Sequence, residues 1–299
     1  MNKLIWDINI NQIIFKNNLI RQTIILYPFI RTLSKFTRFI GFDIFICRYQ
    51  SIITFYSAKE DEKLYPLNPK GDYINLGSGG FRHKKWINYD FPAKTKYYRQ
   101  IQGKLNKDFN PINLNDRILN ICSSQIEACY ISHTLEHLPR KNSLRVIKQI
   151  YENLVNGGII RIVLPDIDKL FDNLKINKTQ FYEDDLFELS NKIFGKISKK
   201  DFKFEDLNQL FLSSSTTESY YKNLIKRWPY LELPIDNHPE YHLCCWNREF
   251  LLKNMESKNY FKNCSILEKN KSQFKPFCNS AVFDTTEPKD SIYLEIMKF

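Results

Sequence analysis

The segment 127–164 constrains the fold of this chain more than any other part of the sequence. Residues 127–132 have the composition of a buried strand, and apolar side chains recur at helical spacing over residues 139–155. The Asn-Gly-Gly run 156–158 is expected to end that helix, and residues 159–164 are nearly all apolar, as in a buried parallel strand. Strand, helix and strand in this order predict a βαβ unit with a right-handed crossover, and therefore an α/β fold.

Shorter patterns extend this unit in both directions. Residues 73–76 and 86–89 are predicted to be strands, and residues 169–235 predict a helical insertion or lid over the carboxyl edge of the sheet. Two further strand-like runs, 280–285 and 291–298, are separated by turn-forming residues and predict an antiparallel hairpin. The fold class expected is therefore a Rossmann-like, doubly wound, mostly parallel sheet with a C-terminal antiparallel hairpin.

The N-terminal part of the chain differs from the rest. Residues 1–60 are apolar and basic and predict a helical segment packed on the main domain, or alternatively an amphipathic segment lying on an anionic membrane. Residues 57–70 are charged and contain proline, which is typical of a linker. We expect a helical extension and linker over residues 1–70 and a single α/β domain over residues 71–299.

Charge and cysteine content bear on partners and location. The net charge of +11 favours an acidic partner, such as nucleic acid, an anionic glycan or a lipid surface, although a general lysine-rich composition gives the same excess. The seven cysteines are scattered, with no C-x-x-C pair, which fits a reducing cytoplasm. Neither a signal peptide nor a membrane span is predicted, so we expect a cytoplasmic protein, with peripheral contact at the inner membrane face through residues 1–60 as an alternative.

A glycine turn after the strand 73–76 is the first candidate binding site. Glycine allows the backbone to turn sharply at Gly77 and Gly79, on either side of Ser78, and to approach a ligand closely. Asp90 ends the next predicted strand, where a carboxylate can accept both hydroxyls of a ribose. No phosphate-binding lysine of the P-loop kind follows the glycines, which argues against a nucleoside triphosphate, and an ordinary tight turn is the alternative.

Two more candidates follow later strands. His133 emerges after the strand 127–132, at the edge where doubly wound sheets bind ligands. Asp166 follows the strand 159–164 and can hold a substrate hydroxyl, act as a base, or cap the next helix. Residues 133–137 also match the H-x-x-E-H zinc-protease motif, but a strand before them and a proline after them leave no continuous helix, so we expect no metal.

Five motifs, taken together and in order, resemble those of class I S-adenosylmethionine (SAM)-dependent methyltransferases. They are Ile-Asn-Leu-Gly-Ser-Gly at 74–79, Trp-Ile-Asn-Tyr-Asp at 86–90, Ser-His-Thr-Leu-Glu-His-Leu at 132–138, Asn-Gly-Gly at 156–158 and Arg-Ile-Val-Leu-Pro-Asp at 161–166. They are particularly similar to a small bacterial group with the motifs LNLGCG, WINVD, SHVLEHL and GGxLRIxVPD. His242 with Trp246 and Leu251, and Asp284 with residues 291–295, resemble later parts of that group.

The resemblance implies SAM as the cofactor. It places Gly77, Ser78 and Gly79 at the methionine and ribose portions, Asp90 on the ribose hydroxyls, and His133 near the methyl-donor end. The acidic residue that commonly contacts adenine in such enzymes is expected near Lys104, where only Asp108 lies close in sequence.

The resemblance also implies a reaction. Enzymes of this kind often accompany glycan assembly, so we expect in-line methylation of a sugar hydroxyl, on a small molecule or a glycan precursor. His133, Asp166 and His242 are the candidate bases. The alternatives are a nucleic-acid methyltransferase, for which no base-flipping motif is present, and a non-catalytic Rossmann-like module that binds SAM. The oligomeric state is not predicted.

Overall fold

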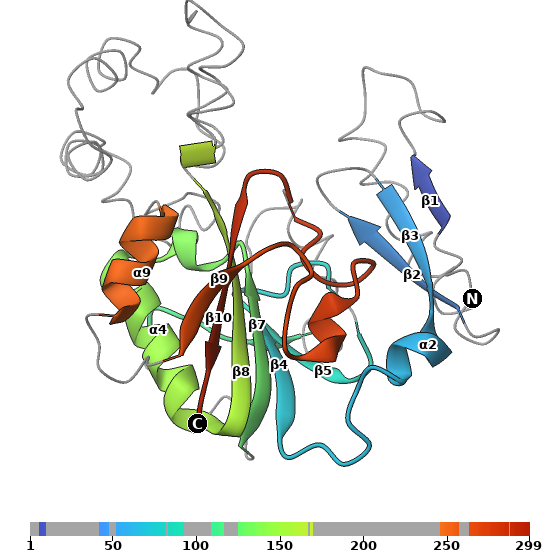
Figure 1. Ribbon diagram of the computed structural model, residues 1–299, viewed down its shortest axis with the longest axis horizontal. Coiled ribbons are helices and arrows are strands. Elements are labelled where there is room, and N and C mark those ends of the chain that lie inside the picture. The colour runs from blue at the N-terminus through green and yellow to red at the C-terminus, as the bar shows by residue number, and fades with distance from the viewer. Residues whose placement is uncertain are drawn as a thin grey trace, which may run out of the picture.

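The computed structural model describes residues 6–9, 42–47, 52–81, 83–92, 109–116, 125–166, 168–169, 246–256, 263–286 and 288–299 (Figure 1). Seven strands form the main sheet. They are β4 (Asp72–Leu76), β5 (Trp86–Asp90), β6 (Asn110–Pro111), β7 (Ile126–Ser132), β8 (Leu154–Pro165), β9 (Cys264–Leu267) and β10 (Ser291–Met297).

The strand order is β6-β5-β4-β7-β8-β10-β9, and the pairs from β6 to β8 are all parallel, whereas β10 is antiparallel to both β8 and β9. The chain passes outward from β4 through β5 and β6 and then returns to β7 on the other side of β4. This reversal is a topological switch point, and ligands of open α/β sheets bind there, beyond the carboxyl ends of the strands. The predicted fold class is therefore confirmed.

Helices cover one face of this sheet. α4 (Arg140–Asn153), the 3-10 turn η2 (Leu135–His137) and α9 (Arg248–Glu256) lie against it, as Figure 1 shows for α4 and α9. Alternate side chains of β8, such as Ile160 and Ile162, point to this face and pack with Val146 and Ile147 of α4. Pro139 directly precedes α4, where its fixed φ suits a helix start.

An irregular segment covers the opposite face. Residues 268–284, here called the strap, include the 3-10 turn η5 (Lys275–Cys278) and bury Phe277 and Phe283 in an aromatic cluster. The cluster also contains Tyr130 of β7 and Trp86 of β5. Aromatic side chains thus cover this face of the sheet, as the helices cover the other.

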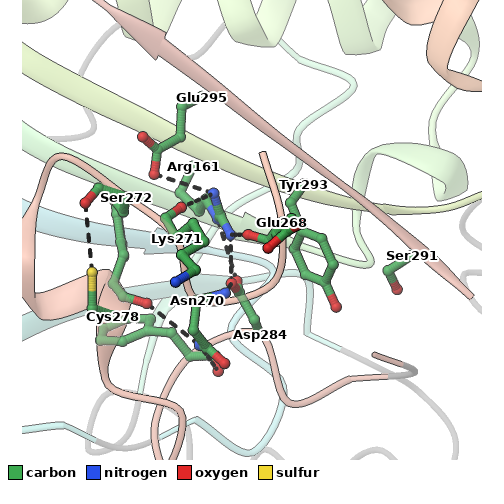
Figure 2. Close-up of polar contacts among 12 residues, drawn as sticks. Arg161, Glu268, Asn270, Lys271, Ser272, Cys278, Asp284, Ser291, Tyr293 and Glu295 are labelled. Carbon is green, nitrogen blue, oxygen red and sulfur yellow. Dashed lines mark hydrogen bonds and ion pairs between the residues drawn. The ribbon is translucent and has the colours of Figure 1, made fainter. Parts of the chain in front are cut away.

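A buried arginine attaches the strap to the sheet (Figure 2). Arg161 of β8 lies 2.5 Å from Asp284 and 3.2 Å from Glu295 of β10, and it donates to the carbonyls of Glu268 and Lys271. Burial alone would lower the pKa of Arg161, but the attraction of the two carboxylates outweighs it and the pKa is raised.

The N-terminal prediction of helices is wrong for the described segments. β1 (Trp6–Asn9), β2 (Phe42–Cys47) and β3 (Ile52–Ser57) form an antiparallel sheet of order β1-β3-β2. β2 and β3 are rich in β-branched and aromatic residues, which suit a pleated surface better than a helix. The predicted linker, residues 57–70, contains the helix α2 (Ala58–Glu62). Asp61 and Tyr65 of this segment are buried, so these residues pack against the rest of the protein.

Two other predictions need correction. The predicted hairpin between residues 280–285 and 291–298 is not formed, because β10 instead pairs with β8 and β9. Residues 280–285 form turns, in which the Asn279 carbonyl accepts from the amides of Val282 and Phe283. The helix α4 ends at Asn153, before the Asn-Gly-Gly run, which lies inside β8. Gly157 there has a φ of +80° and donates to the Lys298 carbonyl, so this glycine shapes the strand and does not end the helix. The predicted insertion over 169–235 lies outside the described residues except for Lys169.

Candidate functional site

The glycine turn lies directly beyond β4, at the switch point. The amides of Gly77 and Ser78 both donate to the carbonyl of Tyr89 on β5, at 2.9 and 3.1 Å. Gly77 and Gly79 have φ values of +69° and +49°, in the left-handed region that favours glycine. The predicted strand-and-turn arrangement is therefore present.

The two glycines are needed for different reasons. A Cβ on Gly77 would overlap the side chain of Thr134, which follows β7, so Gly77 permits close packing between the two strand ends. A Cβ on Gly79 would meet no atom of the described residues within 4 Å. The space beside Gly79 is thus open, and Ser78 beside it has a buried hydroxyl without a hydrogen-bond partner in the described part of the chain.

Asp90 joins this turn to the end of β5. Its Oδ2 accepts from the Gly79 amide at 2.8 Å, and its Oδ1 accepts from the Phe91 amide at 2.8 Å. Each carboxylate oxygen can accept a second hydrogen bond, so an Asp90 side chain oriented in this way can also bind hydroxyl groups. An open glycine, an unpartnered hydroxyl and an oriented carboxylate fit the ribose and methionine portions of SAM.

His133 follows β7 with an unusual backbone. Its φ is +48°, which is uncommon for a residue other than glycine and costs free energy. The ring Nε2 lies 3.0 Å from the Ser291 hydroxyl, and Nδ1 lies 3.4 Å from Oε1 of the buried Glu136. A carboxylate at Nδ1 favours a proton on that nitrogen, which leaves Nε2 as the basic atom.

Ser291 and Glu136 were not predicted as site residues. Ser291 opens β10 opposite Pro165 of β8, and Glu136 lies in η2. A sequence contains no local signal that a serine 158 positions after a histidine will contact it. Glu136 follows His133 by three residues, a spacing that brings side chains together in a helical turn. This spacing was the sequence signal that could have predicted the contact.

Asp166 lies beyond the carboxyl end of β8. Its Oδ2 accepts from Nε of Arg248 at 3.3 Å, whereas Oδ1 is buried and has no partner among the described residues. Burial raises the pKa of Asp166 above its ordinary value, although the positive charges of Lys169 and Arg248 oppose the shift. Burial likewise lowers the pKa of Lys169. Asp166 is therefore a better proton acceptor near neutral pH than an exposed aspartate.

The start of β10 brings His133 and Asp166 to one place. The Asp166 amide donates to the Asp290 carbonyl at 2.7 Å, the Lys169 ammonium donates to the Ser291 carbonyl at 2.8 Å, and the Ser291 hydroxyl contacts His133. The predicted site residues that the structure describes thus share one edge of the sheet. His242 and Lys104 lie outside the described residues.

The described residues contain neither a metal-binding cluster nor a membrane-spanning helix. No cluster of three His, Cys, Asp or Glu side chains suited to a metal occurs within the described ranges. His133 precedes η2 and His137 ends it, so the two histidines of the H-x-x-E-H match do not share an α-helix. None of the helices in the described part of the chain has the length and apolar character needed to cross a membrane.

No protein-family model matches the chain, and comparison with curated proteins found no match. Among solved structures, the plantazolicin methyltransferase BpumL, in complex with a triazolic desmethylPZN analogue and SAH, is 11% identical over 80% of this chain and 81% of its own, with a TM-score of 0.41. Its counterpart BamL, with the same analogue and SAH, is 13% identical over 76% of each chain, with a TM-score of 0.39. A SAM-dependent methyltransferase from Thermotoga maritima is 12% identical over 80% and 87%, with a TM-score of 0.37. At such low identity and TM-score, the site must be interpreted from its own residues.

Proposed function

We propose that the chain is a SAM-dependent methyltransferase whose cofactor lies beyond the carboxyl ends of β4, β5 and β7. The observation that carries this proposal is the 2.8 Å hydrogen bond between Gly79 and Asp90, at the switch point and beside open space. It links a backbone that a ligand can approach closely with a carboxylate that can accept ribose hydroxyls. The ordered motifs of the sequence support the same cofactor.

When bound, SAM supplies an electrophilic methyl group on a sulfonium. Gly77, Ser78 and Gly79 hold the cofactor by close backbone approach, and Asp90 fixes its ribose. Holding the acceptor oxygen in line with that methyl group provides most of the acceleration that such a transfer needs. The remaining task is to remove the proton of the acceptor hydroxyl.

His133 and Asp166 are the proposed bases. His133 Nε2 takes the proton of the acceptor, and the Glu136 carboxylate stabilises the charged ring that forms. Asp166, with its raised pKa and unpartnered Oδ1, binds a second hydroxyl of the acceptor or serves as the base itself. His242 remains a proposed third candidate.

We propose a sugar or glycan precursor as the acceptor, because the sequence motifs resemble those of enzymes that accompany glycan assembly. A cytoplasmic protein with peripheral contact at an anionic membrane, through residues 1–60, fits the same proposal. Flotation of the whole protein with anionic vesicles tests that contact, and binding that does not weaken as salt rises would contradict it.

Calorimetry with SAM and S-adenosylhomocysteine (SAH) tests the cofactor site. Asp90→Ala is expected to reduce affinity by about tenfold or more, because the ribose hydroxyls lose a charged acceptor. The exposed Asp116→Ala is the control and should bind as the wild type does. Equal affinity in wild type and Asp90→Ala would refute the site. Binding of SAH without turnover on any hydroxylated sugar would contradict the sugar acceptor and would favour a nucleic-acid methyltransferase or a non-catalytic SAM-binding module.

A further inference from the structure

Arg140, the first residue of α4, lies against the start of α9. Its guanidinium carbon is 4.3 Å from the ring centre of Phe250 and 5.8 Å from that of Trp246. Stacking on aromatic rings holds the guanidinium plane and leaves its N–H groups to bind an acceptor. Two of its nitrogens, Nε and Nη2, are buried and have no hydrogen-bond acceptor in the described part of the chain.

Trp246 connects this guanidinium to Asp166. Trp246 and Asp166 form a parallel β-bridge, and each residue is only 1% exposed. The indole Nε1 has no acceptor, and Asp166 Oδ1 has no donor, in the same described ranges. These two atoms therefore do not satisfy each other, although their residues are neighbours.

The unpartnered atoms have a definite chemistry. Nε and Nη2 of Arg140 and Nε1 of Trp246 are donors that require acceptor oxygens, and a guanidinium binds oxyanions best. Asp166 Oδ1 is an acceptor and requires a donor, such as a hydroxyl group. Leaving such buried groups unsatisfied costs free energy, so a ligand with an oxyanion and a hydroxyl would complete them.

The position of these atoms connects them with the proposed reaction. Asp166 lies beyond β8 and is linked through Asp290 and Ser291 to His133, the proposed base. Figure 1 shows α4 and α9 side by side near this end of β8. The side chain of Arg248, which donates to Asp166, is 53% exposed.

We infer that Arg140, Trp246 and Asp166 form the acceptor subsite and that the acceptor is an acidic sugar, either a uronic acid or a sugar phosphate. Arg140 and the indole N–H of Trp246 bind the oxyanion, and Asp166 accepts from a neighbouring hydroxyl. This inference rests on the proposed methyltransferase function and names its substrate class. A neutral sugar offers Arg140 only hydroxyl oxygens, without the charge-assisted hydrogen bonds that an oxyanion forms, and inorganic phosphate lacks the sugar hydroxyl for Asp166.

Binding measurements on the whole protein test the subsite without turnover. The probes are glucuronic acid, glucose 6-phosphate, glucose and inorganic phosphate, each measured by calorimetry or by competition in saturation-transfer NMR. At least one of the two acidic sugars is expected to bind about tenfold or more tightly than both glucose and inorganic phosphate. The tighter acidic sugar identifies the oxyanion. Affinity for both acidic sugars no better than for glucose would overturn the inference, and so would equal affinity for inorganic phosphate.

Matched variants separate the subsite from a general effect of charge. Arg140→Gln is expected to lose about tenfold in affinity for the preferred acidic sugar and to leave glucose binding unchanged. Lys141→Gln, at the exposed neighbouring position, removes the same charge and should change neither. Equal losses in the two variants would overturn the inference. Trp246→Phe keeps an aromatic ring, removes only the N–H donor, and provides a second test with a smaller expected loss.

SAH binding and the thermal midpoint are measured on the same samples. Retained SAH affinity in Arg140→Gln shows that the variant is folded and that the loss is confined to the acceptor. If wild-type protein binds an acidic sugar as expected but does not bind SAH, the methyltransferase proposal fails and the subsite stands. If SAH binds and the acidic sugars do not, only the acceptor inference fails.

Discussion

The imidazole Nε2 of His133 lies 3.0 Å from the hydroxyl of Ser291, although 158 residues separate them in the chain. His133 leaves β7, and Ser291 begins β10, which is two strands away in the sheet. The Ser291 hydroxyl also lies 3.3 Å from the Thr286 carbonyl, and its single proton can be donated either to that oxygen or to His133 Nε2. The antiparallel strand therefore positions the ring of the proposed base.

Ser291→Ala should lower kcat by about 10- to 100-fold, because a misplaced catalytic group loses its alignment with the acceptor. SAH affinity should stay unchanged, since Ser291 is not one of the residues proposed to hold the cofactor. Steady-state kinetics and calorimetry measure the two quantities. Ser265→Ala, at an exposed position of β9, is the control. Unchanged kcat in Ser291→Ala would contradict the positioning role.

Gly79→Val should abolish measurable SAH binding, because its side chain would enter the open space that we assign to the cofactor. Gly157→Val provides a matched control. Both glycines have positive φ, and at both a Cβ would meet no atom within 4 Å in the part of the chain that the structure describes, so both variants suffer the same kind of backbone strain. Only Gly79 adjoins the proposed site. Loss of SAH binding in both variants would show that strain, and not occupation of the site, is responsible.

Local patterns predicted the parts of the fold that depend on neighbouring residues. The unit β7–α4–β8 follows from apolar spacing, and the turn after β4 follows from the conformational freedom of Gly77 and Gly79. The N-terminal strands were mistaken for helices because short apolar runs do not distinguish the two structures. Residues 280–285 have the composition of a strand, but Asn279 and the buried Arg161–Asp284 pair hold them as turns.

The site was predictable only in part, for the same reason. Asp90, His133 and Asp166 were found because each directly follows a strand and so reaches the carboxyl edge. Ser291 and Arg140 were missed because their importance depends on contacts formed in three dimensions. Ser291 contacts a side chain 158 positions away, and Arg140 stacks on Phe250, which is far along the chain. Periodicity within one segment cannot indicate such contacts.

Asp166 should make stability depend on pH in a direction opposite to that of an aspartate whose pKa is lowered in the folded protein. Burial raises its pKa in the folded protein above the ordinary value of 3.8. The folded state then binds the proton more tightly than the unfolded chain, so this contribution to stability is greatest at low pH. It falls as the pH rises through 3.8 to the raised value, and is constant above that value.

Urea denaturation of wild type and Asp166→Asn over a series of pH values measures this contribution. The wild-type free energy of unfolding minus that of the variant should decrease with rising pH and then level off. Asp116→Asn, at an exposed position, is measured in the same series as the control for loss of an aspartate. A difference that grows with pH would mean that Arg248 and Lys169 stabilise the Asp166 carboxylate more than burial destabilises it.

The buried network around Arg161 should dominate the stability of the strap. Arg161→Met leaves Asp284 and Glu295 buried without their cation, and breaking such a group typically costs about 3–5 kcal/mol. Burial already raises the pKa of Glu295, which lowers the cost of its neutral form, so Glu295→Gln should destabilise the protein less than Arg161→Met. Lys148→Met removes a surface ion pair with Glu152 and should cost less than about 1 kcal/mol. Urea denaturation gives all three values.

Two outcomes would contradict this account. Equal losses of unfolding free energy in Arg161→Met and Glu295→Gln would mean that Glu295 carries its full charge in the network. A loss in Arg161→Met no larger than that in Lys148→Met would mean that the aromatic cluster alone holds the strap on the sheet.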